Sequence, residues 1–224
     1  MSFRWFAPIL SAAIIAATPA SATSLDGGFE KLKTEALAGD AKATFLLGQM
    51  FLNGSGGVTK NINTGLDLDF LGAYRGDPEA EHDIGGLYQV GGDLLGVNNI
   101  KKDGVAAMHW YMRAVHHGYA LSANKIAEIY SQGQFAEQDP VKSMIYLTVA
   151  YRLLTEHPEL QLMYGKRLTD DRIAVYKSAV KGDMDKMAEY IKQTYQGDQG
   201  IYVNKIIDAG VKSTLSDVVS PGSR

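Results

Sequence analysis

The sequence predicts an all-α fold, a short right-handed α/α solenoid of stacked helix pairs. Two observations lead to this prediction. Three windows of the chain share one spacing of small, aromatic and glycine residues, and each is followed by a second helical pattern that begins at Asn or Asp. Spacings of three and four residues place side chains on one face of a helix. A helix-pair unit that recurs about every 40 residues is typical of a solenoid.

The first helix of each pair carries a small residue after an aliphatic one, then an aromatic residue and then a glycine, each three positions later. The small residue lets a neighbouring helix approach, the aromatic side chain fills the space beside it, and the glycine suits a helix end that needs a positive φ. The windows contain Leu47, Gly48, Phe51 and Gly54; Ile84, Gly85, Tyr88 and Gly91; and Ile126, Ala127, Tyr130 and Gly133.

The second helix of each pair begins at a residue that accepts hydrogen bonds from free backbone N–H groups, namely Asn61, Asp103 or Asp139. Three positions within each helix then correspond between the windows. They hold Leu68, Asp69 and Gly72 in the first; Trp110, Tyr111 and Ala114 in the second; and Tyr146, Leu147 and Ala150 in the third. The first two windows end on Gly76 and Gly118, whereas the third has Leu154 at that point.

These residues resemble the Sel1-like repeat, a relative of the tetratricopeptide repeat with a longer loop between its helices. The second window carries nearly the whole pattern, whereas the first has Leu68 and Asp69 where the family has an aromatic pair. The loop of the second window is longer than the family's around Leu94 and Leu95. The resemblance covers residues 36–154 and implies a concave groove that binds a peptide or a partner protein.

The predicted organisation follows the repeats. It comprises a signal peptide (1–22), an N-terminal capping helix (23–40), three repeats (41–76, 77–118 and 119–154) and a C-terminal helical tail (155–224). In the capping helix, Phe29, Leu32, Ala36 and Leu37 are expected to share one face. In the tail we expect a short helical piece from His157 to about Lys166, a helix from Thr169 to Gly182, and another from Asp183.

The first 22 residues resemble a secretory signal peptide. Arg4 supplies the positive start, an apolar run follows, and small residues precede an expected cleavage between Ala22 and Thr23. A retained membrane anchor is the alternative, although the run is shorter than the roughly 20 apolar residues of a spanning helix. We therefore expect a periplasmic or secreted protein with no stable membrane span after cleavage.

Composition narrows the chemistry that the chain can perform. It has 224 residues, a formal net charge of −3 and no cysteine. The absence of cysteine excludes disulfides, thiolate catalysis and cysteine-bound zinc. The mildly acidic balance argues against nucleic acid and anionic membranes as partners.

Individual residues offer little sign of catalysis. His82, His109, His116 and His117 lack a carboxylate or a further histidine at metal-ligand spacing. The glycine-rich segment around Ser55 lacks the Lys-Ser/Thr of a phosphate-binding loop and is interpreted as a turn. The acid pairs Asp67/Asp69 and Asp170/Asp171 do not form a general acid/base couple, because the first pair diverges on a helix and the second suits a helix start. We expect no catalytic, cofactor-binding or metal-binding residue.

The resemblance favours a non-enzymatic adaptor, scaffold or regulator of the bacterial cell envelope that binds a protein or peptide. Two alternatives remain open: a hydrolase directed at the cell wall or at β-lactams, and a structural subunit of an envelope complex. Trp110 is interpreted as a packing residue between helices rather than a ligand platform. Leu94 and Leu95 either fold onto the solenoid or meet a partner.

Overall fold

The computed structural model describes residues 28–218, and in this range it confirms the predicted all-α solenoid. The α-helices are α2 (Gly28–Leu37), α3 (Ala41–Asn53), α4 (Ile62–Tyr74), α5 (Pro78–Val90), α6 (Gly104–His116), α7 (Ala120–Gln132), α8 (Pro140–Glu156), α9 (Asp170–Thr194) and α10 (Asp198–Ser216). Two short 3-10 helices, η1 (Gly92–Leu95) and η2 (Pro158–Leu160), and one hairpin of β1 (Leu162–Met163) and β2 (Lys166–Arg167) complete this part of the chain.

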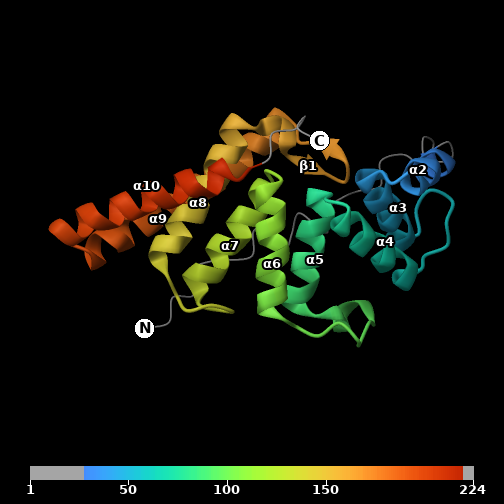
Figure 1. The fold of residues 1–224 in the computed structure, drawn as a ribbon, viewed down its shortest axis with the longest axis horizontal. Helices are drawn as coiled ribbons and strands as arrows, with labels where there is room; N and C mark the ends of the chain where they lie inside the picture. Colours follow the sequence, from blue (N-terminus) through green and yellow to red (C-terminus); the bar gives the residue numbers. More distant parts are fainter. Residues whose placement is uncertain (1–27, 219–224) are drawn as a thin grey trace.

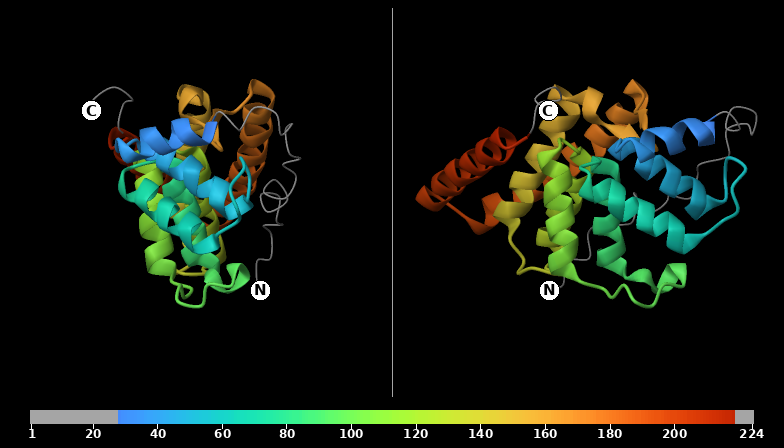
Figure 2. Two further views of the ribbon diagram at one scale, coloured as in Figure 1. Left: turned by 90° about the vertical axis from the view of Figure 1, so that its right-hand side faces the viewer. Right: turned by 45° about the vertical axis from the view of Figure 1, so that its right-hand side comes forward.

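The helices stack in chain order. Helices α3 and α4, α5 and α6, and α7 and α8 form three antiparallel pairs, and α4 packs on α5 as α6 packs on α7. Figure 1 shows the pairs side by side, with α2 at one end of the row. Helices α9 and α10 pack on α8 and extend the opposite end (Figure 2). Each pair therefore buries its apolar face against its neighbours, as a repeat array requires.

Side-chain caps fix where the second helices begin. Asn61, Asp103 and Asp139 each accept hydrogen bonds from backbone N–H groups in the first turn of α4, α6 and α8. At the other end of the first helices, Gly54 and Gly133 adopt φ values of 67° and 66°. Glycine tolerates this left-handed conformation without strain, so the chain turns at these two points into the loop that leads to the next helix.

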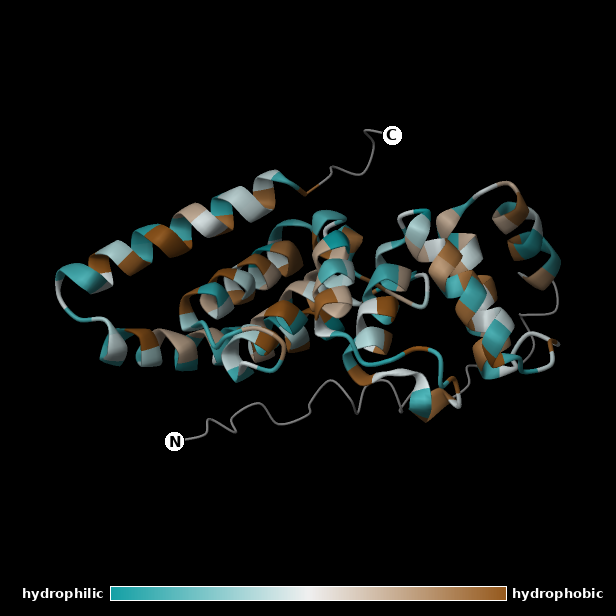
Figure 3. Cartoon of the chain, turned by 60° about the horizontal axis from the view of Figure 1, so that its bottom comes forward, coloured by the Kyte–Doolittle hydropathy of each residue, from teal (hydrophilic) through white to brown (hydrophobic). Residues whose placement is uncertain are grey.

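The buried side chains form neighbouring clusters that follow the pairs. One cluster joins α3 to α6 and includes Phe45, Ile84 and Trp110. The largest lies among α6, α7 and α8 and extends to Ile173 and Val180 of α9. Hydrophobic residues also recur along α10 (Figure 3), where Val203 and Val211 are buried against α8 and α9. The tail therefore covers the end of the solenoid.

The short helix predicted from His157 to about Lys166 is wrong beyond Leu160. The chain instead forms the β1–β2 hairpin, in which Leu162 pairs with Arg167 and Met163 with Lys166. The two turn residues, Tyr164 and Gly165, have φ values of 51° and 74°, which suits a tight two-residue hairpin turn.

Tertiary contacts explain the extended conformation of this segment. The buried side chain of Gln161 accepts a hydrogen bond from Ala120 N at 3.0 Å and donates to Gly118 O at 2.9 Å. Its own carbonyl accepts a bond from Leu168 N at 2.8 Å. These bonds hold both ends of the hairpin against the start of α7.

Two further predictions are wrong. The break expected at Gly182 is absent, because α9 continues through this residue to Thr194. Its apolar residues Ile173, Val180 and Ile191 are buried along the whole length, and this packing overrides the local signal of one glycine. Leu37 is 79% exposed, because a residue next to Ala36 on a helix points about 100° away from the packed face.

The predicted signal peptide and its cleavage point between Ala22 and Thr23 lie outside the described residues. Within residues 28–218, no helix combines the length and the apolar character needed to cross a membrane.

Candidate functional site

The first helices of the three pairs share one largely polar face, partly exposed and partly buried, which we call the first-helix face. It is defined by Lys42, Leu46 and Gln49 of α3, by Glu79, His82 and Asp83 of α5, and by Ser122 and Lys125 of α7. Hydrogen bonds connect its members across helices, as Gln49 bonds to Asp83 and His82 to Ser122. The face therefore brings together side chains from all three repeats.

One amide of this face, that of Gln49, links two carboxyl groups. Gln49 Nε2 donates to Asp69 Oδ2 at 3.1 Å and to Asp83 Oδ2 at 3.3 Å. Asp69 is only 2% exposed, and its second oxygen, Oδ1, has no hydrogen-bond partner. Asp83 is exposed to solvent. The amide therefore links a buried acid to an accessible one.

Burial determines the protonation of this pair. Loss of water around Asp69, reinforced by the charge of Asp83, raises the pKa of Asp69 to about 9 and outweighs the bond from Gln49. Although Asp83 is exposed, the protein around its carboxyl group displaces part of its water, and this effect, with the charges of Glu79 and Asp77, raises the pKa of Asp83 to about 7. At neutral pH, Asp69 is a neutral acid and Asp83 is near its midpoint.

Glu79 connects the face to the tail hairpin. Its buried Oε2 accepts a hydrogen bond from Gly165 N at 2.7 Å and lies 3.7 Å from Lys42 Nζ. Burial raises the pKa of Glu79, and the Gly165 bond and the Lys42 charge partly offset that effect. The hairpin thus reaches back from the tail to α3 and α5, as Figure 1 also shows.

His82 is the histidine of this face. Its Nδ1 lies 2.8 Å from Ser122 Oγ, and its ring lies 5.4 Å from that of Tyr111 and 5.2 Å from that of Tyr119, measured between centroids. This enclosure, together with the charge of Lys125, lowers the pKa of His82 to about 3. The imidazole is therefore neutral at physiological pH.

Behind this face lies a buried ion pair. Glu81 is fully buried, with His117 Nδ1 2.7 Å from its Oε2 and Arg113 Nη2 3.0 Å from its Oε1. Arg113 also stacks on the Trp110 ring at 4.7 Å and donates to Ala73 O. Arg113, His116 and His117 border a hollow of about 320 Å³ beside Tyr74 and Asp217.

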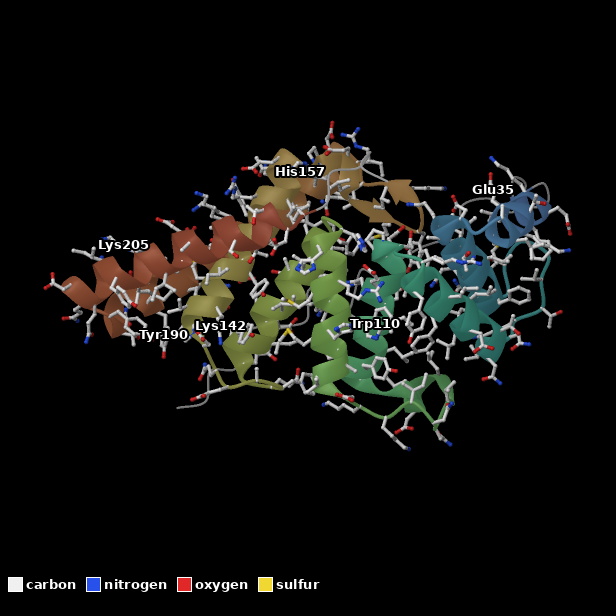
Figure 4. All side chains as sticks on the ribbon, viewed as in Figure 1. Glu35, Trp110, Lys142, His157, Tyr190 and Lys205 are labelled. Atoms are coloured by element: carbon white, nitrogen blue, oxygen red, sulfur yellow. The ribbon has the colours of Figure 1, made fainter. Side chains whose placement is uncertain are left out.

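Trp110 lies between helix pairs. Its ring meets that of Tyr74 edge to face at 5.3 Å, and 6% of its surface is exposed. Figure 4 labels Trp110 on its helix. This position makes it a packing residue. His109 is exposed beside it. The described residues contain no group of three or more His, Asp or Glu side chains that could hold a metal ion.

The remaining repeat residues lie at contacts between helices. A Cβ atom on Gly85 would stand 2.7 Å from the Tyr111 ring, and one on Gly48 would stand 2.9 Å from Gly65 O and even closer to Asp69 Oδ1. Gly76, Gly91 and Gly118 have positive φ values at the turns between helices. Leu47, Ile84, Ala114 and Ala150 are buried, and Tyr88 packs against the core. Tyr130 stacks on Tyr146 at 6.0 Å.

The apolar loop does not fold onto the solenoid at Leu94, which is 85% exposed within η1. Gly92 N bonds to Ile100 O at 2.9 Å and closes the loop. Of the two outcomes that the sequence left open, a packed Leu94 is therefore wrong.

Sequence reasoning missed the link between Asp69 and Asp83, because it paired Asp69 with its neighbour Asp67. Asp67 is exposed, whereas Asp69 turns inward. A signal was present, since Asp69 occupies the repeat position that holds Tyr111 in the second pair and Leu147 in the third, both buried. An acid at a repeat position that is otherwise buried and apolar or aromatic indicates a role other than packing.

Comparison with known proteins identifies the repeats. A family model described as the Sel1 repeat matches residues 41–68, 78–119 and 120–153. The crystal structure of a Sel1 repeat protein from Oxalobacter formigenes is 26% identical in sequence, with a TM-score of 0.48, and the match covers 54% of this chain and 86% of that one.

A protective antigen of uropathogenic Escherichia coli strains, which displays an SLR fold, is 16% identical with a TM-score of 0.33. That match covers 88% of this chain and 44% of the antigen, so the chain spans less than half of its length. No curated protein sequence matches the chain at a significant level.

Proposed function

This chain is a Sel1 repeat protein, and from that premise we propose that it is an exported, non-enzymatic adaptor of the bacterial cell envelope. Sel1 repeats are generally protein–protein interaction modules, and stacked repeats provide the extended surface that such binding uses. We assign the groove that receives a peptide or partner protein to the first-helix face.

The observation that carries this proposal is the polar character of the first-helix face. Gln49 and Asp83 come from different pairs, are bonded to each other and remain accessible to solvent. Solvated side chains that are held in place by neighbours lose little conformational freedom when they bind, so such a surface is suited to a partner.

A hydrolase directed at the cell wall or at β-lactams is the competing function, and one contact resembles it. The pair of His82 Nδ1 and Ser122 Oγ, 2.8 Å apart, has the geometry of a base and a nucleophile. However, Ser122 is fully buried, and an imidazole whose pKa is about 3 is a weak base at neutral pH. These two properties favour a packing role for the pair.

Affinity purification from a crosslinked envelope extract tests the adaptor function. The bait is residues 23–224, the chain expected after cleavage. We expect one envelope protein to be recovered in stoichiometric amount, and we expect Asp83→Lys to abolish its recovery. Asp185→Lys, on exposed α9, is the matched control because it changes the charge equally away from the first-helix face. Recovery of glycan fragments alone, or equal recovery by both variants, would contradict the proposal.

Export is tested separately. When the full chain is expressed in a Gram-negative host, we expect the periplasmic fraction to contain a protein whose first residue is Thr23. An intact N-terminus in the cytoplasm would contradict export, and an intact N-terminus in the membrane would support the retained anchor.

A further inference from the structure

We propose that Asp83, Gln49 and the buried Asp69 form a recognition site for a lysine or arginine side chain of the partner, with Glu79 and Tyr164 at its edge. This inference rests on the proposed function, because it assigns a chemical class to the segment that binds the first-helix face. The occupant is a basic segment of another protein.

Charge complementarity is the first argument. Four acids lie around the part of the face that holds Asp83, namely Asp69, Asp77, Glu79 and Asp83 itself. The nearby cation is Lys42, 3.7 Å from Glu79. The next cation along the face, Lys125, already pairs with Glu128 at 3.0 Å. One carboxyl oxygen of Asp77 accepts a hydrogen bond from Ala80 N at the start of α5. Asp83, the exposed acid of this group, is thus left with the Gln49 amide and no cation of its own.

The unsatisfied oxygen of Asp69 is the second, independent argument. A buried polar atom without a partner destabilises the folded chain, so its presence needs an explanation. Leucine or tyrosine occupies the same repeat position elsewhere, so the fold itself does not require an acid here. A cation bound at Asp83 favours the charged forms of both Asp83 and Asp69. An ionisable group at this repeat position would then have a function in binding.

The geometry favours an organic cation over a metal ion. The group between the two carboxyls is the Gln49 NH₂, a donor, and a bare metal ion requires acceptors from every side. An ammonium or guanidinium group that approaches Asp83 from solvent keeps both amide bonds intact. It also forms the charge-assisted hydrogen bond that such groups prefer.

The tail hairpin supplies the edge of the site. Gly165 N donates to Glu79, so the chain already places one hydrogen-bond donor against the acids of α5. Burial raises the pKa of the Tyr164 phenol, and the nearby charges of Asp83 and Glu79 raise it further. Its ring is partly exposed and offers an aromatic face to a bound cation.

The test measures fluorescence anisotropy of a short, labelled peptide of alternating lysine and alanine with the full mature chain at low salt. A glutamate–alanine peptide of the same length is the negative probe. We expect the lysine peptide to bind and the glutamate peptide not to bind. Asp83→Asn is expected to weaken binding by about tenfold, whereas Asp185→Asn leaves it unchanged. Thermal melting checks that both variants are folded.

A pH series gives a second readout. The acids that face Asp83 are Asp69, Asp77 and Glu79, with Lys42 beyond Glu79. Three tyrosines also lie near enough to feel its charge, namely Tyr111, Tyr119 and, on the hairpin, Tyr164. Because the pKa of Asp83 is about 7, lysine-peptide binding should strengthen as the pH rises from 6 to 8. Asp83→Asn should remove most of this rise.

The inference is overturned if the lysine peptide binds no better than the glutamate peptide, or if Asp83→Asn and Asp185→Asn bind it equally. The adaptor function survives that result if the envelope partner is still lost with Asp83→Lys, because the partner would then use other chemistry on the same face. If the peptide effect is absent and Asp83→Lys and Asp185→Lys also recover the envelope partner equally, the proposed function is overturned as well.

Discussion

At the scale of single residues, the fold depends on where small and polar side chains meet their neighbours across the helix pairs. Gly85 makes room for the Tyr111 ring, and Asp69 replaces such a ring with a buried acid. The contact between Gly85 and Tyr111 stabilises the stacking of the helices, whereas the buried acid Asp69 weakens it. Each leads to a prediction.

Gly85→Ala is expected to destabilise the chain, because the new Cβ would stand 2.7 Å from the Tyr111 ring. Displacement of a packed aromatic ring costs about 1–3 kcal/mol. Gly182→Ala is the control, since no atom lies within 4 Å of its Cβ position in the middle of α9. There alanine should stabilise the helix by up to about 1 kcal/mol. Urea denaturation measures both, and equal shifts would show that Gly85 is not a close contact.

Asp69→Asn is expected to stabilise the chain at pH 8, and to stabilise it less at pH 5. The pKa of Asp69 is raised to about 9 on folding, so the folded chain holds a proton that the unfolded chain loses above about pH 4. The contribution of Asp69 to stability is therefore present below pH 4 and declines as the pH rises towards 9. Asparagine keeps the shape of the protonated acid and removes this decline. Parallel pH profiles for the two proteins would contradict a neutral, buried Asp69.

At the scale of elements, the hairpin shows how distant contacts decide local structure. Gln161→Leu is expected to lower the free energy of unfolding by about 2–3 kcal/mol, because Ala120 N and Gly118 O lose their buried partner. Gln193→Leu, an exposed change on α9, should have an effect within about 0.5 kcal/mol. Guanidinium denaturation compares them. Equal effects would mean that the hairpin is not anchored as described.

The elements that the sequence predicted are those whose signals are local and repeated. Asn61, Asp103 and Asp139 mark helix starts by type alone, and the recurring small and aromatic residues define the helix that precedes each. The sequence did not predict the hairpin, because the residues that bond to it, Ala120 and Glu79, lie far away along the chain. The link between Asp69 and Asp83 escaped for the same reason.

At the scale of the whole molecule, the array depends on contacts between consecutive pairs. Trp110 of α6 packs against Tyr74 at the end of α4 and shares a buried cluster with Phe45 and Ile84. Trp110→Ala should therefore cost about 3 kcal/mol or more and loosen the first pair from the second. Calorimetry should show a lower melting temperature, and hydrogen exchange should quicken in α3 and α4. Unchanged melting would contradict this stacking.

The proposed partner binds a surface rather than a single residue, namely the first-helix face. Site-specific photocrosslinking in living cells tests this binding, with a photoreactive amino acid at Lys125 on this face or at Lys192 on the exposed side of α9. We predict one discrete adduct from the first position that disappears in the Asp83→Lys background, and none from the second. Adducts from Lys192 but not from Lys125 would place the partner elsewhere and contradict binding at the first-helix face.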